Sequence, residues 1–136
     1  MTSPCVDLTT AQRLVAAAHA EAQRRAVTVS AAVVDSGGHL VAFGRMDGAE
    51  IAGPVLAVDK AYTAVANSTP TAELGVLAAP GGELFGLQAN GGGRFVIFGG
   101  GIPLRAGGVI VGGVGVSGAS AADDVACAEA AVAAFG

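Results

Sequence analysis

The clearest indication of the fold lies in residues 33–48, Val33-Val34-Asp35-Ser36-Gly37-Gly38-His39-Leu40-Val41-Ala42-Phe43-Gly44-Arg45-Met46-Asp47-Gly48. An apolar run ends at an acidic residue, the chain turns on two glycines, and a second apolar run follows. Glycine adopts positive φ angles without steric cost, and a tight connection between antiparallel strands needs such angles. The stretch therefore predicts a β-hairpin joining strands at 27–34 and 40–45, with Asp35 capping the turn.

Periodicity outside this hairpin predicts helices and a second pair of strands. Residues 8–26 have helical spacing, and Thr9 and Gln12 have that of a capping box. The apolar stripe of this helix consists of Ala11, Leu14, Val15, Ala18 and Ala22. The other expected elements are helices at 51–67, at 71–77 and after Ser120, strands at 94–98 and 109–116, and a loop at 78–93 with one helical turn at 83–87. This order predicts one α+β domain over residues 1–136, a central antiparallel sheet flanked by helices.

The composition predicts a self-associating protein. Hydrophobic residues make up 52% of the chain, charged residues only 13%, and the mean hydropathy is +0.61. A domain of this size leaves part of such apolar surface exposed, so we expect a homo-oligomer. No apolar run reaches the roughly 18 to 20 residues of a membrane span. A net charge of −4 and few aromatic residues argue against nucleic-acid binding.

The cysteines and the first residues predict a cytoplasmic location. Cys5 and Cys127 stand near opposite ends of the chain, with no spacing typical of a disulfide framework or a zinc site. Residues 1–7 lack the charged and apolar regions of a signal peptide. A reducing compartment is therefore the expectation.

The glycines at 113–118 match the dinucleotide-binding pattern G-x-G-x-x-G, but a packing role is the better interpretation. The dinucleotide fold needs a further strand and an acidic residue about 20 positions on, and this sequence has only one more helix. Glycines on a strand let another element approach the backbone closely. We therefore expect Gly112, Gly113 and Gly115 to accept a helix, a second subunit or a flat ligand.

Charged residues gather where the hairpin ends. Arg45, Asp47 and Glu50 precede the helix that carries Lys60. Arg45 and Lys60 could together hold a carboxylate, whether of a substrate or of a haem propionate. A solvated turn, with Lys60 paired to Glu50 or Asp59, is the plainer alternative.

Two further residues are candidates for chemistry. His19, at the margin of the first helix's apolar stripe, could ligate haem iron or act as an acid or base, or it could simply be packed. Ser117 lies in a glycine-rich turn, but no His-Asp pair that would activate it is evident.

The ordered set of motifs resembles the GlcG/HbpS-like haem-binding family, and also the carboxy-terminal domain of PduO-type corrinoid adenosyltransferases. Besides the hairpin, the matching pieces are Leu8-Thr9-Thr10-Ala11, Arg45-Met46-Asp47-Gly48, Lys60-Ala61-Tyr62-Thr63-Ala64, Gly99-Gly100-Gly101-Ile102-Pro103-Leu104, Gly112-Gly113-Val114-Gly115-Val116-Ser117-Gly118 and Asp123-Asp124. The resemblance implies a profilin-like α-β-α sandwich whose dimers assemble further, often to octamers. It also implies haem as a cofactor, with His19 where some relatives place a ligand to the iron, and a place in catabolic operons.

Three functions remain open at this point. The first is a cytoplasmic haem-binding or haem-handling oligomer, the second a haem-independent enzyme acting on a small organic acid or carbonyl compound, and the third a non-catalytic assembly module. We expect a small-molecule pocket between the turn at 45–47, the Lys60 helix and segment 113–118, near a subunit boundary. The predicted ligand-binding residues are His19, Arg45, Asp47, Glu50, Lys60, Gly115 and Ser117.

Overall fold

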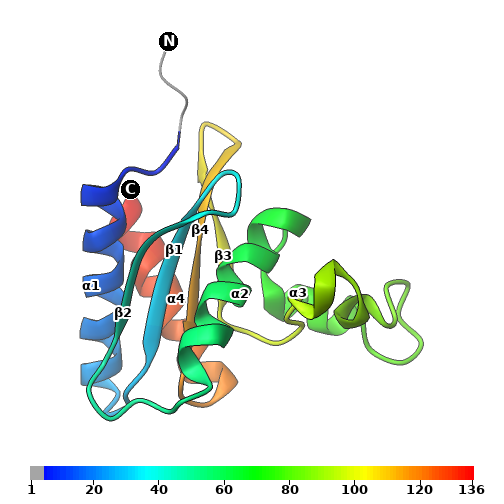
Figure 1. Ribbon diagram of the computed structural model, residues 1–136, viewed down its shortest axis with the longest axis horizontal. Helices are drawn as coiled ribbons and strands as arrows, with labels where there is room; N and C mark the ends of the chain where they lie inside the picture. The colour runs from blue at the N-terminus through cyan, green and yellow to red at the C-terminus, as the bar shows by residue number, and fades with distance from the viewer. Residues whose placement is uncertain (1–4) are drawn as a thin grey trace.

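The computed structural model describes residues 5–136, and Figure 1 shows their path. The main elements are α1 (Leu8–Arg24), β1 (Ser30–Asp35), β2 (Leu40–Arg45), α2 (Gly53–Asn67), α3 (Thr71–Leu77), β3 (Gly101–Ala106), β4 (Val109–Ser117) and α4 (Ala121–Phe135). Residues 1–4, on which the expectation of no signal peptide partly rests, lie outside the described residues. None of the described helices is both long and apolar enough to cross a membrane.

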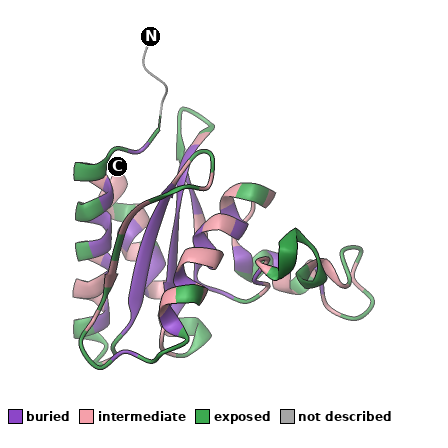
Figure 2. Ribbon diagram, in the orientation of Figure 1, coloured by how far each residue is buried: buried purple, intermediate pink, exposed green. Residues whose placement is uncertain are grey.

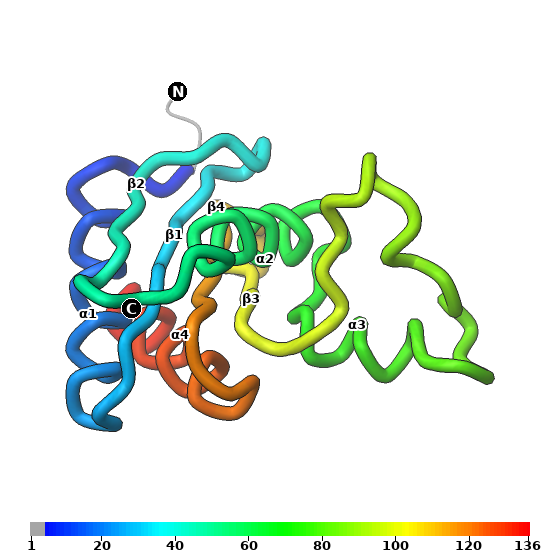
Figure 3. Tube along the Cα trace, turned by 60° about the horizontal axis from the view of Figure 1, so that its bottom comes forward, coloured from blue at the N-terminus to red at the C-terminus, as the bar shows by residue number. Residues whose placement is uncertain are grey.

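The four strands form one antiparallel sheet in the order β2-β1-β4-β3. Helices α1 and α4 pack against each other on one face of the sheet, and α2 covers the other face (Figures 1 and 3). Buried residues concentrate in β1, in β4 and on the inner faces of these helices (Figure 2). The predicted α+β sandwich is confirmed.

The hairpin forms as its turn residues predict. Gly38 has a φ of +82°, and the Asp35 amide donates to the His39 carbonyl at 2.8 Å. The Asp35 carboxylate accepts from the amides of Gly37, at 2.9 Å, and His39, at 3.0 Å. Asp35 therefore caps the turn, and local backbone chemistry fixes this part of the sheet.

Helix α1 buries the predicted stripe, but it begins differently from the prediction. Its buried residues are Ala11, Leu14, Val15, Ala18 and Ala22. The N-cap is Asp7, whose carboxylate accepts from the Thr10 amide at 2.8 Å. Aspartate is among the strongest N-cap residues, which explains why it, rather than Thr9, caps the helix.

Close packing between α2 and β4 explains the glycines of β4. A Cβ atom on Gly115 would lie 1.9 Å from the Ala57 carbonyl oxygen, and one on Gly113 would lie 2.7 Å from Val65 Cγ2. Both contacts are far below van der Waals distance. The predicted steric role is confirmed, and the element that approaches these glycines is a helix.

The predicted strand at 94–98 is wrong, and the strand that pairs with β4 is Gly101–Ala106. Interactions with α2 hold residues 94–96 outside the sheet. Arg94 donates to Asp59 at 2.9 Å, and the Val96 amide donates to Thr63 Oγ1 at 3.0 Å. Because these side chains occupy the segment's hydrogen-bonding groups, apolar composition alone does not make it a strand.

Residues 71–95 project from the sandwich (Figure 1). After α3, the segment contains short 3-10 turns at Leu87–Ala89 and Gly91–Gly93. The predicted turn at 83–87 is present as a hydrogen-bonded turn, in which the Leu87 amide donates to the Leu84 carbonyl at 3.0 Å. Its side chains Val76 and Phe85 are 74% and 66% exposed. This projection adds apolar surface that the sandwich does not bury.

Candidate functional site

A pocket of about 380 Å³ opens where β2 ends beside α1. Its lining residues are His19, Gln23, Arg45, Met46 and Asp47. The structure thus brings together three of the predicted site residues, His19, Arg45 and Asp47. Gln23 also lines the pocket but was not predicted. The helical spacing could have indicated it, because a residue four positions after His19 lies on the same face of the helix.

His19 is held against β2 by a backbone hydrogen bond. Its Nε2 lies 3.0 Å from the Gly44 carbonyl oxygen. A carbonyl only accepts, so Nε2 is the donor in this bond, and the tautomer that the bond selects has its lone pair on Nδ1. Gly44 makes the approach feasible, because a Cβ there would lie 2.7 Å from His19 Cε1.

Arg45 is positioned by the turn that follows it. Its Nε and Nη2 donate to the Ala49 carbonyl at 3.1 and 2.5 Å. Both bonds use the same side of the guanidinium group, and Nη1 makes no hydrogen bond with residues 5–136. Arg45 and Asp47 are exposed, so charges of both signs stand at the pocket.

The structure does not bring Lys60 to this pocket, so that part of the prediction is wrong. Lys60 lies on the inner face of α2 and is fully buried, and its ammonium donates to the Val116 carbonyl at 2.9 Å and to Asp124 Oδ2 at 3.2 Å. The Phe98 ring centre lies 5.0 Å from Nζ. Lys60 therefore forms a buried ion pair with Asp124 of α4. The alternative partners considered from the sequence, Glu50 and Asp59, do not form this pair.

Burial dominates the titration of this pair. It lowers the pKa of Lys60 below its ordinary value, although Asp124 favours the charged ammonium. Burial likewise raises the pKa of Asp124, against the opposing effects of Lys60 and of the Ala119 amide. Asp124 was not among the predicted site residues, because nothing local in the sequence links two residues that are 64 positions apart.

The other predicted site residues lie apart from the pocket. Gly115 is buried under α2, where it serves packing. Ser117 is 3% exposed at the end of β4. Glu50 is exposed in the turn before α2, close enough to Lys60 to favour its charged form. The predicted pocket lay between the turn at 45–47, the Lys60 helix and segment 113–118. In the observed pocket the turn at 45–47 faces α1 instead.

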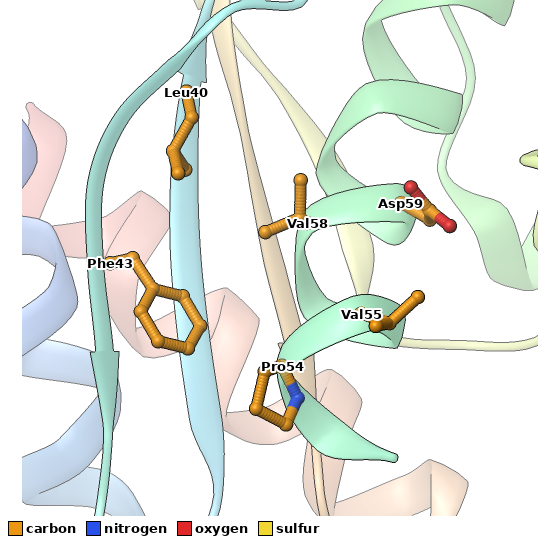
Figure 4. A pocket seen from close by; sticks show the side chains of 6 residues that line it. All are labelled: Leu40, Phe43, Pro54, Val55, Val58 and Asp59. Atoms are coloured by element: carbon orange, nitrogen blue, oxygen red, sulfur yellow. The ribbon is translucent and has the colours of Figure 1, made fainter. Parts of the chain in front are cut away.

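A second, apolar groove of about 390 Å³ lies between β2 and α2 and was not predicted. Its lining residues are Leu40, Phe43, Pro54, Val55, Val58 and Asp59 (Figure 4). In Figure 4 the Phe43 ring faces the helix across the groove. Leu40 is 53% and Phe43 40% exposed, so the groove is an apolar surface on the outer strand of the sheet.

Comparison with known proteins places the chain in a family. The profile of the family described as "Haem degrading protein HbpS-like" matches residues 6–133. An uncharacterised 15.0 kDa protein from the dhaT-dhaS intergenic region of Citrobacter freundii is 38% identical over 130 residues, covering 96% of this chain and 92% of that protein. The corrinoid adenosyltransferase PduO of Salmonella typhimurium is 40% identical over 123 residues, 90% of this chain but only 37% of that enzyme.

A solved structure agrees with this placement. The crystal structure of a PduOC:heme complex superposes with a TM-score of 0.91 and 38% identity, covering 96% of this chain and 94% of that one. Sequence and fold thus match along almost the whole chain. The protein belongs to the HbpS-like family.

Proposed function

We propose that this protein is a cytoplasmic, oligomeric haem-binding protein, with the site in the pocket of His19, Arg45 and Asp47. The orientation of His19 carries the proposal. Histidines that ligate metals usually donate their second ring N–H to a carbonyl or carboxylate, which fixes the tautomer. His19 makes this bond to the Gly44 carbonyl. The residues of the pocket therefore fit an iron porphyrin, which needs one axial nitrogen ligand.

Arg45 supplies the second interaction in this proposal. Its bonds to the Ala49 carbonyl fix the guanidinium group and leave Nη1 for an incoming carboxylate. A haem propionate is such a group. Haem would supply an iron centre able to bind a further small ligand, while the chain's residues hold and orient the porphyrin. The PduOC structure solved with heme supports this choice of ligand.

Hemin titration tests the proposal. Purified protein should give a saturable shift of the Soret band, and His19→Ala should weaken binding by at least roughly tenfold. Gln23→Ala is the matched control, because it alters the same pocket one turn away without removing a ring nitrogen. Arg45→Met should also weaken binding, whereas Arg24→Met, on the exposed side of α1, should not. Wild-type affinity in His19→Ala would contradict the assignment.

The haem-independent enzyme is less well supported. It uses Arg45 and Lys60 together to hold a substrate carboxylate. Arg45 lies at the open pocket, whereas Lys60 is buried and bonded to Val116 and Asp124. The geometry therefore favours the first function over the second.

A further inference from the structure

The buried amine of Lys60 carries the further inference. Lys60 is the one lysine among the 136 residues of the chain, and it is fully buried. A buried ion pair is weak evidence for stability, because apolar residues of similar volume often stabilise a core as well or better. Burial also lowers the pKa of Lys60, which raises the fraction of neutral amine at a given pH. A neutral, desolvated lysine is a nucleophile toward a carbonyl carbon.

An apolar pocket of about 470 Å³ reaches the backbone beside this amine. Its lining includes Ile102 of β3 and Val125 of α4, and Glu129 is the charged residue that lines it. Gly100 also lines the pocket, and a Cβ atom there would lie 2.8 Å from Lys60 Nζ. The pocket and the ammonium group therefore meet at a residue that has no side chain to separate them.

Phe98 covers the same ammonium group. Its ring centre lies 5.0 Å from Lys60 Nζ, while the residue is 47% exposed and lies outside the helices and strands. Exposed side chains change rotamer within nanoseconds, and a ring that is already half in solvent loses little buried area when it rotates. Phe98 is therefore the movable part of the cover over Lys60.

We propose that Lys60 captures a small apolar aldehyde from this pocket as a protonated imine, with Asp124 as the proton acceptor and donor. Asp124 Oδ2 lies 3.2 Å from Lys60 Nζ, and the Ala119 amide holds Oδ1 at 2.9 Å. The apolar walls and the Glu129 carboxylate favour an aldehyde without negative charge. Haem takes no part in this step, so the inference does not rest on the proposed function.

Proton transfers through Asp124 balance the reaction. Asp124 accepts one proton from the ammonium group, and the nitrogen lone pair then forms a bond with the carbonyl carbon. The carbonyl oxygen takes up a proton that the nitrogen releases, which gives a carbinolamine. Asp124 returns its proton to the new hydroxyl group, the C–O bond breaks, and water leaves. The product is a protonated imine, whose positive charge stays paired with the Asp124 carboxylate.

Reductive trapping in the folded and the unfolded protein tests the proposal. Pentanal and cyanoborohydride convert an imine at Lys60 into a stable pentyl-lysine, and mass spectrometry of the digested chain separates it from the labelled amino-terminal amine. A lysine buried only for packing is protected by folding, so it reacts faster in urea than in buffer. We expect the opposite order, with native Lys60 labelled severalfold faster than in urea. Labelling that is no faster in the native protein would overturn the proposal.

Two pairs of variants locate the reaction. Ala72 lines the pocket and is exposed, so Ala72→Phe should fold and should slow native labelling by narrowing the pocket. Ala89→Phe is the matched control, because Ala89 is exposed outside the pocket. Phe98→Ala removes the cover and should speed labelling, whereas Phe85→Ala, on the projecting segment, should not. A native rate that Ala72→Phe leaves unchanged would overturn the assignment of the pocket.

Asp124→Asn tests the proton transfer. The amide keeps the shape of the side chain and an acceptor for the Ala119 amide, but it has no proton to return to the carbinolamine. Native labelling should therefore fall at least roughly tenfold. An unchanged rate would overturn the role of Asp124. The comparison of folded with unfolded wild-type protein needs no variant, so it decides the capture itself even if Asp124→Asn does not fold.

Discussion

Lys60 and Asp124 show how one buried ion pair ties two layers of the fold together. Lys60 comes from α2, Asp124 from α4 on the other face of the sheet, and both side chains are at most 5% exposed. Asp124 also accepts from the Ala119 amide at 2.9 Å, just before α4 begins. Each charge is compensated mainly by the other, so removal of one partner leaves the other desolvated and without its ion-pair partner.

We expect Lys60→Met to lower the free energy of unfolding by about 3–5 kcal/mol, as measured by chemical denaturation. The double variant with Asp124→Asn should lose less than the sum of the single losses, because no buried charge remains and the Ala119 amide keeps an acceptor. Arg94→Met is the control: its pair with Asp59 is 42% exposed at the arginine, so about 1 kcal/mol or less should be lost. Equal losses in Lys60→Met and Arg94→Met would contradict this interpretation.

At the scale of elements, the contact between α2 and β4 depends on glycine. The backbone of α2 approaches so closely that Gly113 and Gly115 have no room for a side chain. The same helix carries Lys60 and forms one wall of the apolar groove. The distance between helix and sheet therefore determines both the buried pair and the groove.

Gly115→Val should separate these elements. Overpacking in a core typically costs about 1–3 kcal/mol, and this contact is with backbone atoms that cannot rotate away, so we expect a loss at the upper end of that range or beyond. Thermal unfolding measures it. Ala106→Val, on the exposed end of β3, is the control and should leave the melting temperature nearly unchanged. A Gly115→Val protein as stable as wild type would show that α2 does not pack as described.

At the scale of the whole molecule, the surface carries more apolar area than the sandwich can cover. Large apolar side chains are exposed at Ile51 (93%), Val76 (74%), Val55 (66%) and Phe85 (66%). They lie on two separate regions, the turn and helix beside the groove and the projecting segment 71–95. Exposed apolar regions of this kind usually mark interfaces.

We therefore expect an oligomer in solution. Light scattering at micromolar concentration should give a multiple of 13.0 kDa. Salt should weaken this association little, because apolar contacts rather than charges would hold it. A mass equal to that of the single chain would refute the expectation.

Features that depend on near neighbours in the chain could be predicted from the amino-acid sequence. The hairpin follows from Asp35, Gly37 and Gly38 because all of its capping bonds span at most four residues. The buried stripe of α1 follows from a period that every turn of the helix repeats. The steric use of the β4 glycines was also predictable, since a strand without side chains implies a close neighbour.

The contacts between residues far apart in the chain could not be predicted in this way. Residues 94–96 have strand-like composition, but Asp59 and Thr63 on α2 bind them and move the sheet partner of β4 to Gly101–Ala106. Lys60 was expected beside Arg45 and is paired with Asp124, whereas His19 joins Arg45 because α1 packs on β2. Such contacts depend on the packing of whole layers, and the residues that make them share no local pattern in the chain.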